Sequence, residues 1–181
     1  MWPSHGSRTL AERFRGTTTH KVDSKGRVSI PADFRRVLDA QDPDREAGTS
    51  PRVVILFGDS RTPWLECYSI ETMAELEAKV ETMDDDDPRY EPLVDYVFSD
   101  SQTVPLDGSG RLVLTKELRD RVGIGEDAVF RARGKYFRIY SPDVPDNLTA
   151  HLPKLLADLP PEKSLRGVLA ASNRPAAEAS E

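Results

Sequence analysis

The chain has 181 residues, 38% of them hydrophobic and 31% charged, enough for one ordinary domain or two small ones around a modest core. No apolar run is long enough to cross a bilayer, and residues 1–15 lack the apolar segment of a signal peptide, so we expect a cytoplasmic protein without a membrane partner. The single cysteine, Cys67, excludes an intrachain disulfide and is expected to be a small core residue.

The net charge of −6 argues against a general polyanion binder, but the charge is distributed unevenly. Residues 14–37 contain six basic and two acidic residues, whereas residues 66–95 contain eleven acidic and two basic ones. Because salt screens charges over roughly 8–10 Å, the basic segment can attract phosphate on an otherwise acidic chain. The overall sign therefore predicts weak nucleic-acid binding per subunit and does not exclude it.

The most informative feature is an internal repeat. Residues 20–31 (HKVDSKGRVSIP) match residues 104–115 (VPLDGSGRLVLT) at an offset of 84, and the match continues through the pairs Phe-Arg and Leu-Arg that follow. Residues 65–68 resemble residues 137–140 at an offset of 72. The change of offset implies about twelve extra residues in the first copy, which we assign to the polar stretch 39–51.

Each copy is expected to be a compact β-rich unit of strand, glycine-containing turn, strand, short helix and two further strands. Pro31 is tolerated at the start of the first copy's helix, and Ser69 is a candidate N-cap for an amphipathic helix after that copy. The predicted elements are strands at 19–22, 28–30, 53–57, 64–68, 128–132 and 136–140, and helices at 32–38, 70–83, 90–98 and 144–159, the last kinked or split by Pro153.

These elements predict an α+β protein with six segments. They are an N-terminal extension expected to be disordered (1–13), a first module (14–69), a helical linker (70–98), a second module (99–143), a C-terminal helix (144–160) and a mobile tail (161–181).

Both copies contain Asp-x-x-x-Arg, as Asp23 to Arg27 and Asp107 to Arg111. Across a tight turn the aspartate can pair with the arginine or accept amide hydrogens of the turn, and so hold the guanidinium in a defined pose. An arginine placed in this way suits a phosphate or the O6 and N7 atoms of guanine. Taken alone, the pairs could equally serve only to stabilise the turns or a subunit contact.

The segment Phe14-Arg-Gly16, followed by VDSKGRVSIP at residues 22–31 and Phe34-Arg35, resembles the opening of MraZ proteins; the second copy resembles that family's second module less strongly. The resemblance covers about residues 14–159. It implies two AbrB-like modules forming a small barrel of the double-ψ or swapped-hairpin type with flanking helices. It also implies a nucleoid-associated transcription regulator that binds direct repeats in its own promoter as a ring-shaped homo-oligomer. Such proteins usually repress the cell-division and cell-wall gene cluster that follows.

Carried over by position, the resemblance implies DNA-binding roles for the motif residues of both turns. The candidate residues are Asp23, Lys25, Arg27, Asp107 and Arg111, with Arg15 and Lys21 from the basic segment. Arg27 and Lys25 are expected to be the main DNA contacts, and Asp23 the residue that orients Arg27. Ser109 stands where Lys25 does, and Thr115 where Pro31 does, so the second copy is expected to be the weaker DNA reader, with Arg111 serving DNA, structure or the ring interface.

Two other classes of function remain as alternatives. An enzyme is disfavoured, because the three histidines lie far apart and the sequence around Gly108-Ser-Gly110 lacks the strand-to-helix pattern of a phosphate loop. The aspartate run 84–87 is expected to be a solvated helix terminator, and no cofactor is expected. An AbrB-like protein that binds another protein, as antitoxins of that kind do, is the second alternative. Trp64 and Tyr68 are expected to be core residues.

Overall fold

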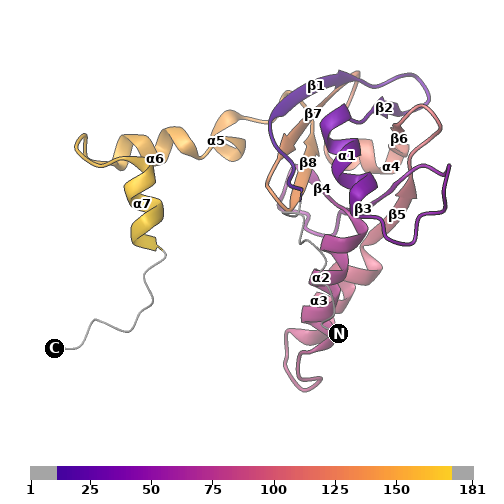
Figure 1. Ribbon diagram of the computed structural model, residues 1–181, viewed down its shortest axis with the longest axis horizontal. Helices are drawn as coiled ribbons and strands as arrows, with labels where there is room; N and C mark the ends of the chain where they lie inside the picture. Colours follow the sequence, from indigo (N-terminus) through magenta and orange to yellow (C-terminus); the bar gives the residue numbers. More distant parts are fainter. Residues whose placement is uncertain (1–11, 173–181) are drawn as a thin grey trace, which may run out of the picture. The chain divides into compact units, whose positions relative to one another are not determined.

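The computed structural model describes residues 12–172, which divide into two units, one up to Asp143 and one from Val144 (Figure 1). The strands of the first unit are β1 (Thr17–Lys21), β2 (Arg27–Ser29), β3 (Arg52–Leu56), β4 (Trp64–Tyr68), β5 (Ser101–Pro105), β6 (Arg111–Val113), β7 (Asp127–Ala132) and β8 (Tyr136–Tyr140). Its helices are α1 (Ala32–Ala40), α2 (Ile70–Glu81), α3 (Tyr90–Val94), the π-helix η1 (Asp95–Ser99) and α4 (Lys116–Arg121). The fold is therefore mixed α+β.

Six strands form one antiparallel sheet in the order β1-β7-β8-β4-β3-β5, and β2 pairs with β6 in a separate two-stranded ladder. The order is symmetric about the β8–β4 pair, so equivalent strands of the two sequence copies occupy equivalent places. The first strand of each copy pairs with the third strand of the other, as β1 with β7 and β5 with β3. The two copies thus exchange strands across an approximate twofold axis.

This exchange corrects the expectation that each copy is a compact unit. The strands flanking the turn at residues 23–26 share a single bridge, Val22 to Val28, and otherwise pair with the opposite copy. The physical reason is burial, because a unit of about 55 residues encloses little apolar surface alone, whereas two interleaved copies enclose one larger core. That core contains Val28 and Leu112 from the ladder together with Phe34 and Leu118 from the two short helices.

The remaining predicted elements of the first unit agree well with the structure. Helix α1 begins at Ala32, directly after Pro31, and Ser69 caps α2 by accepting a hydrogen bond from the backbone N–H of Thr72 at 3.2 Å. Cys67 is fully buried in the core, as expected. The polar stretch 39–51 assigned as the insertion forms the last two residues of α1, which is two residues longer than predicted, and the loop that leads to β3. Helix α2 ends two residues earlier than predicted, at Glu81.

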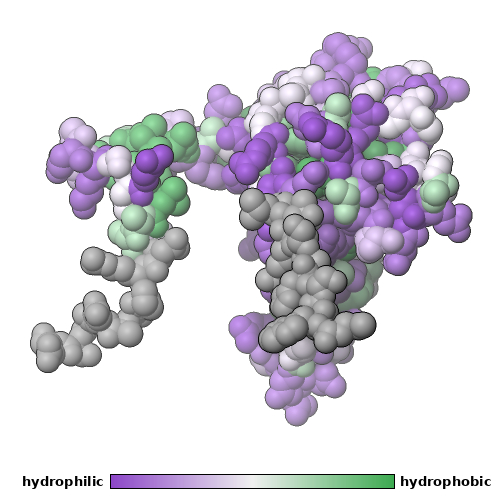
Figure 2. Space-filling view, in the orientation of Figure 1, coloured by the Kyte–Doolittle hydropathy of each residue, from purple (hydrophilic) through white to green (hydrophobic). Residues whose placement is uncertain are grey.

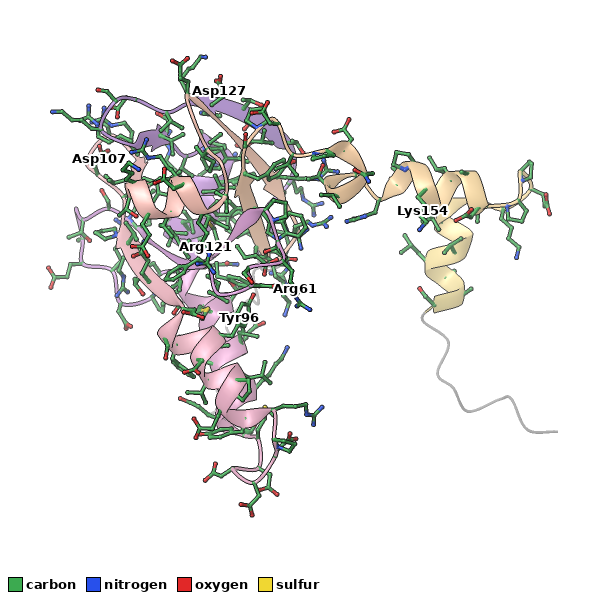
Figure 3. The ribbon with its side chains drawn as sticks, turned by 180° about the vertical axis from the view of Figure 1, so that it is seen from behind. Arg61, Tyr96, Asp107, Arg121, Asp127 and Lys154 are labelled. Atoms are coloured by element: carbon green, nitrogen blue, oxygen red, sulfur yellow. The ribbon has the colours of Figure 1, made fainter. Side chains whose placement is uncertain are left out.

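Helices α2, α3 and η1 form a helical arm that projects from the sheet (Figure 1). Successive residues of β3 point to opposite faces, so Val53 and Ile55 enter the main core while Val54 and Leu56 pack against the arm. Tyr96 lies where the arm meets the sheet (Figure 3). Burial, followed by the charge of Glu66, raises the pKa of Tyr96 to about 12.

Trp64 and Tyr68 are half-buried rather than core residues. Their strand β4 places Leu65 and Cys67 in the core and turns the alternate side chains to the opposite face. On that face the guanidinium of Arg138 lies 3.9 Å from the centroid of the Trp64 ring. Trp64 therefore packs on a cation, whereas Tyr68 stacks on Tyr136 with ring centroids 5.0 Å apart and lies against the arm.

The second unit contains α5 (Asp146–Thr149), α6 (Leu152–Asp158) and α7 (Leu165–Ser172). Pro153 lies in the first turn of α6, so the predicted long helix is split just before the proline, where a missing N–H costs nothing. Helix α7 was not predicted, because its segment shows little apolar periodicity. The surface of this unit is markedly apolar (Figure 2), with exposed leucines at 148, 152, 155, 156, 165 and 169. The expected N-terminal extension lies outside the described residues except for its last two.

Candidate nucleic-acid interface

The first Asp-x-x-x-Arg motif forms a closed turn between β1 and β2. Asp23 Oδ1 accepts hydrogen bonds from the backbone N–H groups of Lys25 and Arg27, both at 2.9 Å, and its Oδ2 accepts one from Arg27 Nε at 2.7 Å. The backbone closes the same turn, because the N–H of Gly26 donates to the carbonyl oxygen of Asp23 at 2.9 Å. The carboxylate therefore has both roles expected from the sequence: it accepts the amide hydrogens of the turn and it fixes the orientation of the guanidinium.

The second motif repeats this arrangement almost bond for bond. Asp107 Oδ1 accepts from the backbone N–H of Ser109 at 2.8 Å and of Arg111 at 3.0 Å, and Oδ2 accepts from Arg111 Nε at 2.7 Å. Gly110, at φ +72°, occupies the left-handed region that glycine adopts without a steric cost. Two segments 84 positions apart thus form the same hydrogen-bonded turn.

Both aspartates are held in the charged form. The hydrogen bond from the backbone N–H of Arg27 is the largest cause that lowers the pKa of Asp23, and the Arg27 side chain lowers it further. Asp107 has a lowered pKa for the same reasons, with Arg111 as its partner. At neutral pH each turn therefore presents a full ion pair whose arginine keeps a fixed direction.

The two arginines lie on one face of the β2–β6 ladder. The register pairs Arg27 with Val113 and Ser29 with Arg111, so these four side chains share a face, while Val28 and Leu112 point into the core. Since the ladder is antiparallel, the two turns lie at its opposite ends, separated by about 7 Å of strand. We call the surface formed by Arg27, Ser29, Arg111 and Val113 the ladder face.

Sequence reasoning missed a second pair of arginines that link the copies. Arg119 of the second copy lies against Gly26 of the first turn, and Arg35 of the first copy lies against Gly110 of the second turn. The ladder reinforces the link, because the N–H of Leu114 donates to the carbonyl oxygen of Gly26 at 2.8 Å. The signal was present in the repeat, where Arg35 aligns with Arg119, but only the strand exchange brings each to the other copy's turn.

The other candidate residues lie at different distances from the turns. Lys25 is exposed at the tip of the first turn, and Ser109 at the tip of the second. Lys21 borders the first turn but forms an ion pair with Asp127 at 2.9 Å, which raises the pKa of the lysine. Arg15 is exposed beyond the far end of β1, so the structure does not bring it to either turn.

Two further features were sought in the part of the chain that the structure describes, a metal-binding group and a membrane-spanning helix. Among residues 12–172, no group of three or more His, Cys, Asp or Glu side chains is placed to hold a metal ion. Within the same range, no helix combines the length and the apolar character needed to cross a membrane. The matching Asp–Arg turns and the ladder face make up the candidate site, because both arginines lie on that face.

Comparison with known proteins shows that the chain is similar to a family of proteins named as regulators. Residues 13–87 match the family described as "MraZ protein, putative antitoxin-like". A protein of Ruegeria sp. (strain TM1040) named "Transcriptional regulator MraZ" is 41% identical over 157 residues, which cover 83% of this chain and 91% of the relative. Proteins of the same name from Ruegeria pomeroyi and Rhodospirillum rubrum are 44% and 37% identical, over 74% and 71% of this chain and 80% and 79% of the relatives.

The class defined by this sequence similarity is that of bacterial proteins named as transcriptional regulators. The chain belongs to the MraZ family.

Proposed function

We propose that the chain is a transcription regulator that binds double-stranded DNA through the ladder face and its two turns. One observation carries the proposal: two Asp–Arg turns with matching hydrogen bonds, related by an approximate twofold axis, hold their arginines on a single face of the ladder. A structural role alone would not require both guanidinium groups on the solvent side of the ladder. The names of the relatives support the same class of function.

The chemistry of the ladder face suits DNA. Among the described residues, no hydrogen bond engages the terminal nitrogens of Arg27 or Arg111, since each aspartate holds only Nε. Two such nitrogens can bind a phosphate or the edge of a guanine in the major groove. Val113, which is 41% exposed and lies opposite Arg27, can contact sugar carbons or a thymine methyl group.

The two turns are proposed to contribute unequally. Lys25 adds a second cation at the tip of the first turn, and Ser109 adds none at the second. Arg27 and Lys25 are the main proposed contacts, with Asp23 orienting Arg27, and Arg111 contributes less. Lys21 and Arg15 are proposed to add only long-range attraction, because one is paired with Asp127 and the other lies away from the turns.

The finer assignments follow the family resemblance and remain proposals. For the fold, we propose modules at 14–69 and 99–143 that interleave as a barrel of the swapped-hairpin type, joined by the linker at 70–98. For the assembly, we propose a ring-shaped homo-oligomer located at the nucleoid. For the regulation, we propose repression of the chain's own promoter and of the division and cell-wall genes that follow it. The strand exchange between copies supports the barrel interpretation. A ring is reasonable for an acidic chain, because several weak sites on neighbouring repeats raise the apparent affinity about 10²–10⁴-fold.

A fluorescence anisotropy titration with DNA from upstream of the chain's own gene, at two salt concentrations, tests the proposal. Wild-type protein should prefer this DNA to random duplex, and its affinity should fall steeply with salt because phosphate contacts release counterions. Arg27→Ala should abolish the preference and Arg111→Ala should weaken it. Arg61→Ala is the matched control, because this arginine is 87% exposed and paired with Asp59 outside the ladder face. Sedimentation establishes that each variant keeps the wild-type oligomer.

Equal binding to both duplexes by an intact oligomer would contradict the proposal. That result would favour the second candidate function, binding to another protein, for which the exposed leucines of the second unit offer a surface.

A further inference from the structure

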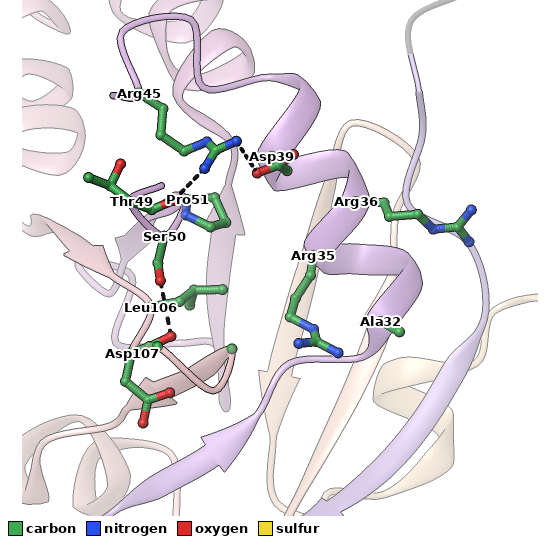
Figure 4. A pocket seen from close by; sticks show the side chains of 12 residues that line it. Ala32, Arg35, Arg36, Asp39, Arg45, Thr49, Ser50, Pro51, Leu106 and Asp107 are labelled. Atoms are coloured by element: carbon green, nitrogen blue, oxygen red, sulfur yellow. Dashed lines mark hydrogen bonds and ion pairs between the residues drawn. The ribbon is translucent and has the colours of Figure 1, made fainter. Parts of the chain in front are cut away.

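A hollow of about 430 Å³ lies beside the second turn, between helix α1 and the loop that follows it (Figure 4). Three arginines and two aspartates line it, together with small and uncharged residues. The charged residues are Arg35, Arg36, Arg45, Asp39 and Asp107. Most of the wall therefore comes from the first copy, although the turn that it borders belongs to the second.

Most of these charges already have partners. Arg45 pairs with Asp39 at 2.8 Å and also donates to the carbonyl oxygen of Thr49, while Asp107 is bound to Arg111. Arg36 is mostly exposed and pairs with Asp33. The positive charge of the hollow therefore depends on the remaining arginine.

Arg35 is that remaining cation. Within residues 12–172 its side chain forms no ion pair and no hydrogen bond, and its Nε is buried without a partner. A buried N–H without an acceptor costs free energy, which an incoming anion would recover. The guanidinium lies against Gly110, so an anion bound to it would also touch the second turn.

The equivalent hollow beside the first turn is different. It measures about 420 Å³ and is lined by Lys21, Val22, Asp23, Ser24, Arg119, Gly125 and Glu126. There Arg119 Nε donates to the carbonyl oxygen of Leu114 at 3.2 Å, and Glu126 adds a negative charge. The two hollows therefore differ in charge, and of the two only the one beside the second turn holds an arginine without an acceptor.

We propose that the hollow beside the second turn binds a phosphate group through Arg35, the lining arginine that has no acidic partner among the described residues. A guanidinium matches phosphate oxygens in geometry and stays charged at any physiological pH. The second turn has Ser109 at the position of Lys25 and so lacks a cation at its tip. Arg35 of the first copy then supplies a cation beside that turn. The phosphate comes either from the DNA backbone, in which case the inference rests on the proposed function, or from a free phosphate compound.

The DNA source is tested by anisotropy with the full chain over a salt series. Arg35→Gln should lower affinity about tenfold and reduce the slope of log K against log salt by about one for each subunit engaged. Arg119→Gln is the matched control and should leave the slope unchanged. Arg35→Lys, which keeps the charge, should retain the slope. Equal losses in Arg35→Gln and Arg119→Gln would mean that both arginines only brace the turns, which would overturn the inference.

The free-phosphate source is tested by titrating inorganic phosphate into DNA-free protein at constant ionic strength, with amide NMR signals of the Gly108–Gly110 turn as the readout. Saturable shifts in wild type that are absent in Arg35→Gln identify a free phosphate compound as the ligand. If neither the salt slope nor these signals depend on Arg35, the inference is wrong. This result can be told apart from a failure of the proposed function. If the proposed function is wrong, the wild-type protein itself shows no preference for the upstream DNA.

Discussion

Replacing Gly26 by alanine should destabilise the fold through a backbone collision that its counterpart in the second turn avoids. Gly26 has φ +77°, where an L-residue costs about 1–2 kcal/mol. A Cβ at this position would overlap the carbonyl oxygen of Leu114, whose own N–H donates to Gly26 at 2.8 Å. Relieving the overlap lengthens that ladder bond and adds about 1 kcal/mol, so we expect a loss of about 2–3 kcal/mol in all.

Two further glycines separate the cost of the positive φ from the cost of the collision with Leu114. Gly123 has φ +66° and open space around its Cβ position, so Gly123→Ala should cost only the conformational part, about 1–2 kcal/mol and about 1 kcal/mol less than Gly26→Ala. At Gly110 the Cβ would meet the side chain of Arg35, which can rotate away, so Gly110→Ala should lose about 1–2 kcal/mol and less than Gly26→Ala.

Urea unfolding at one fixed protein concentration measures the three losses, and unchanged m-values keep the comparison valid. The decisive quantity is the gap between Gly26→Ala and Gly123→Ala. If the two variants are equally destabilised, the ladder contact between the copies is not rigid, and the reasoning from the strand exchange fails.

Three other expected outcomes follow from buried groups. Arg138→Ala should destabilise the protein by about 3 kcal/mol in urea, because Glu66, only 17% exposed, loses a partner that it binds at 3.0 Å; a loss below about 1 kcal/mol would contradict this. Cys67 is fully buried, and burial raises the pKa of its thiol, so a thiol reagent should label it only as fast as the protein unfolds. The hydrogen bond from the side chain of Arg52 lowers the pKa of Asp42 below its ordinary 3.8, so this stabilisation is complete above that pH and is lost as pH falls through the lowered pKa. The stability deficit of Asp42→Asn against wild type should therefore be present at pH 7 and shrink in acid, and a deficit that grows in acid would refute the assignment.

Local chemistry made much of the fold predictable. The Asp-x-x-x-Arg turns, the cap at Ser69 and the buried Cys67 all depend on residues close in the sequence or on strand alternation, which the sequence displays directly. The repeat also predicted that both turns would have the same geometry, and the matching bonds of Asp23 and Asp107 confirm it.

Long-range pairing was not predictable in the same way. Nothing in the pattern of β1 distinguishes a partner in its own copy from one in the other, because both offer an antiparallel strand with the same alternation. The positions of Arg35 and Arg119 depend on that choice, so their contacts with Gly110 and Gly26 emerged only from the fold. Trp64 was misassigned to the core because an apolar strand context does not reveal that Arg138 covers its ring.

The claim that the two turns form the DNA-binding surface is tested most directly by photo-crosslinking. A photoreactive residue replaces Ser24 or Ser109 at the turn tips, or Asp86 on the helical arm as a control, all of them exposed. We predict crosslinks to upstream DNA from the two turn positions, stronger from position 24, and none from position 86. Crosslinks from the arm with none from either turn would contradict the account.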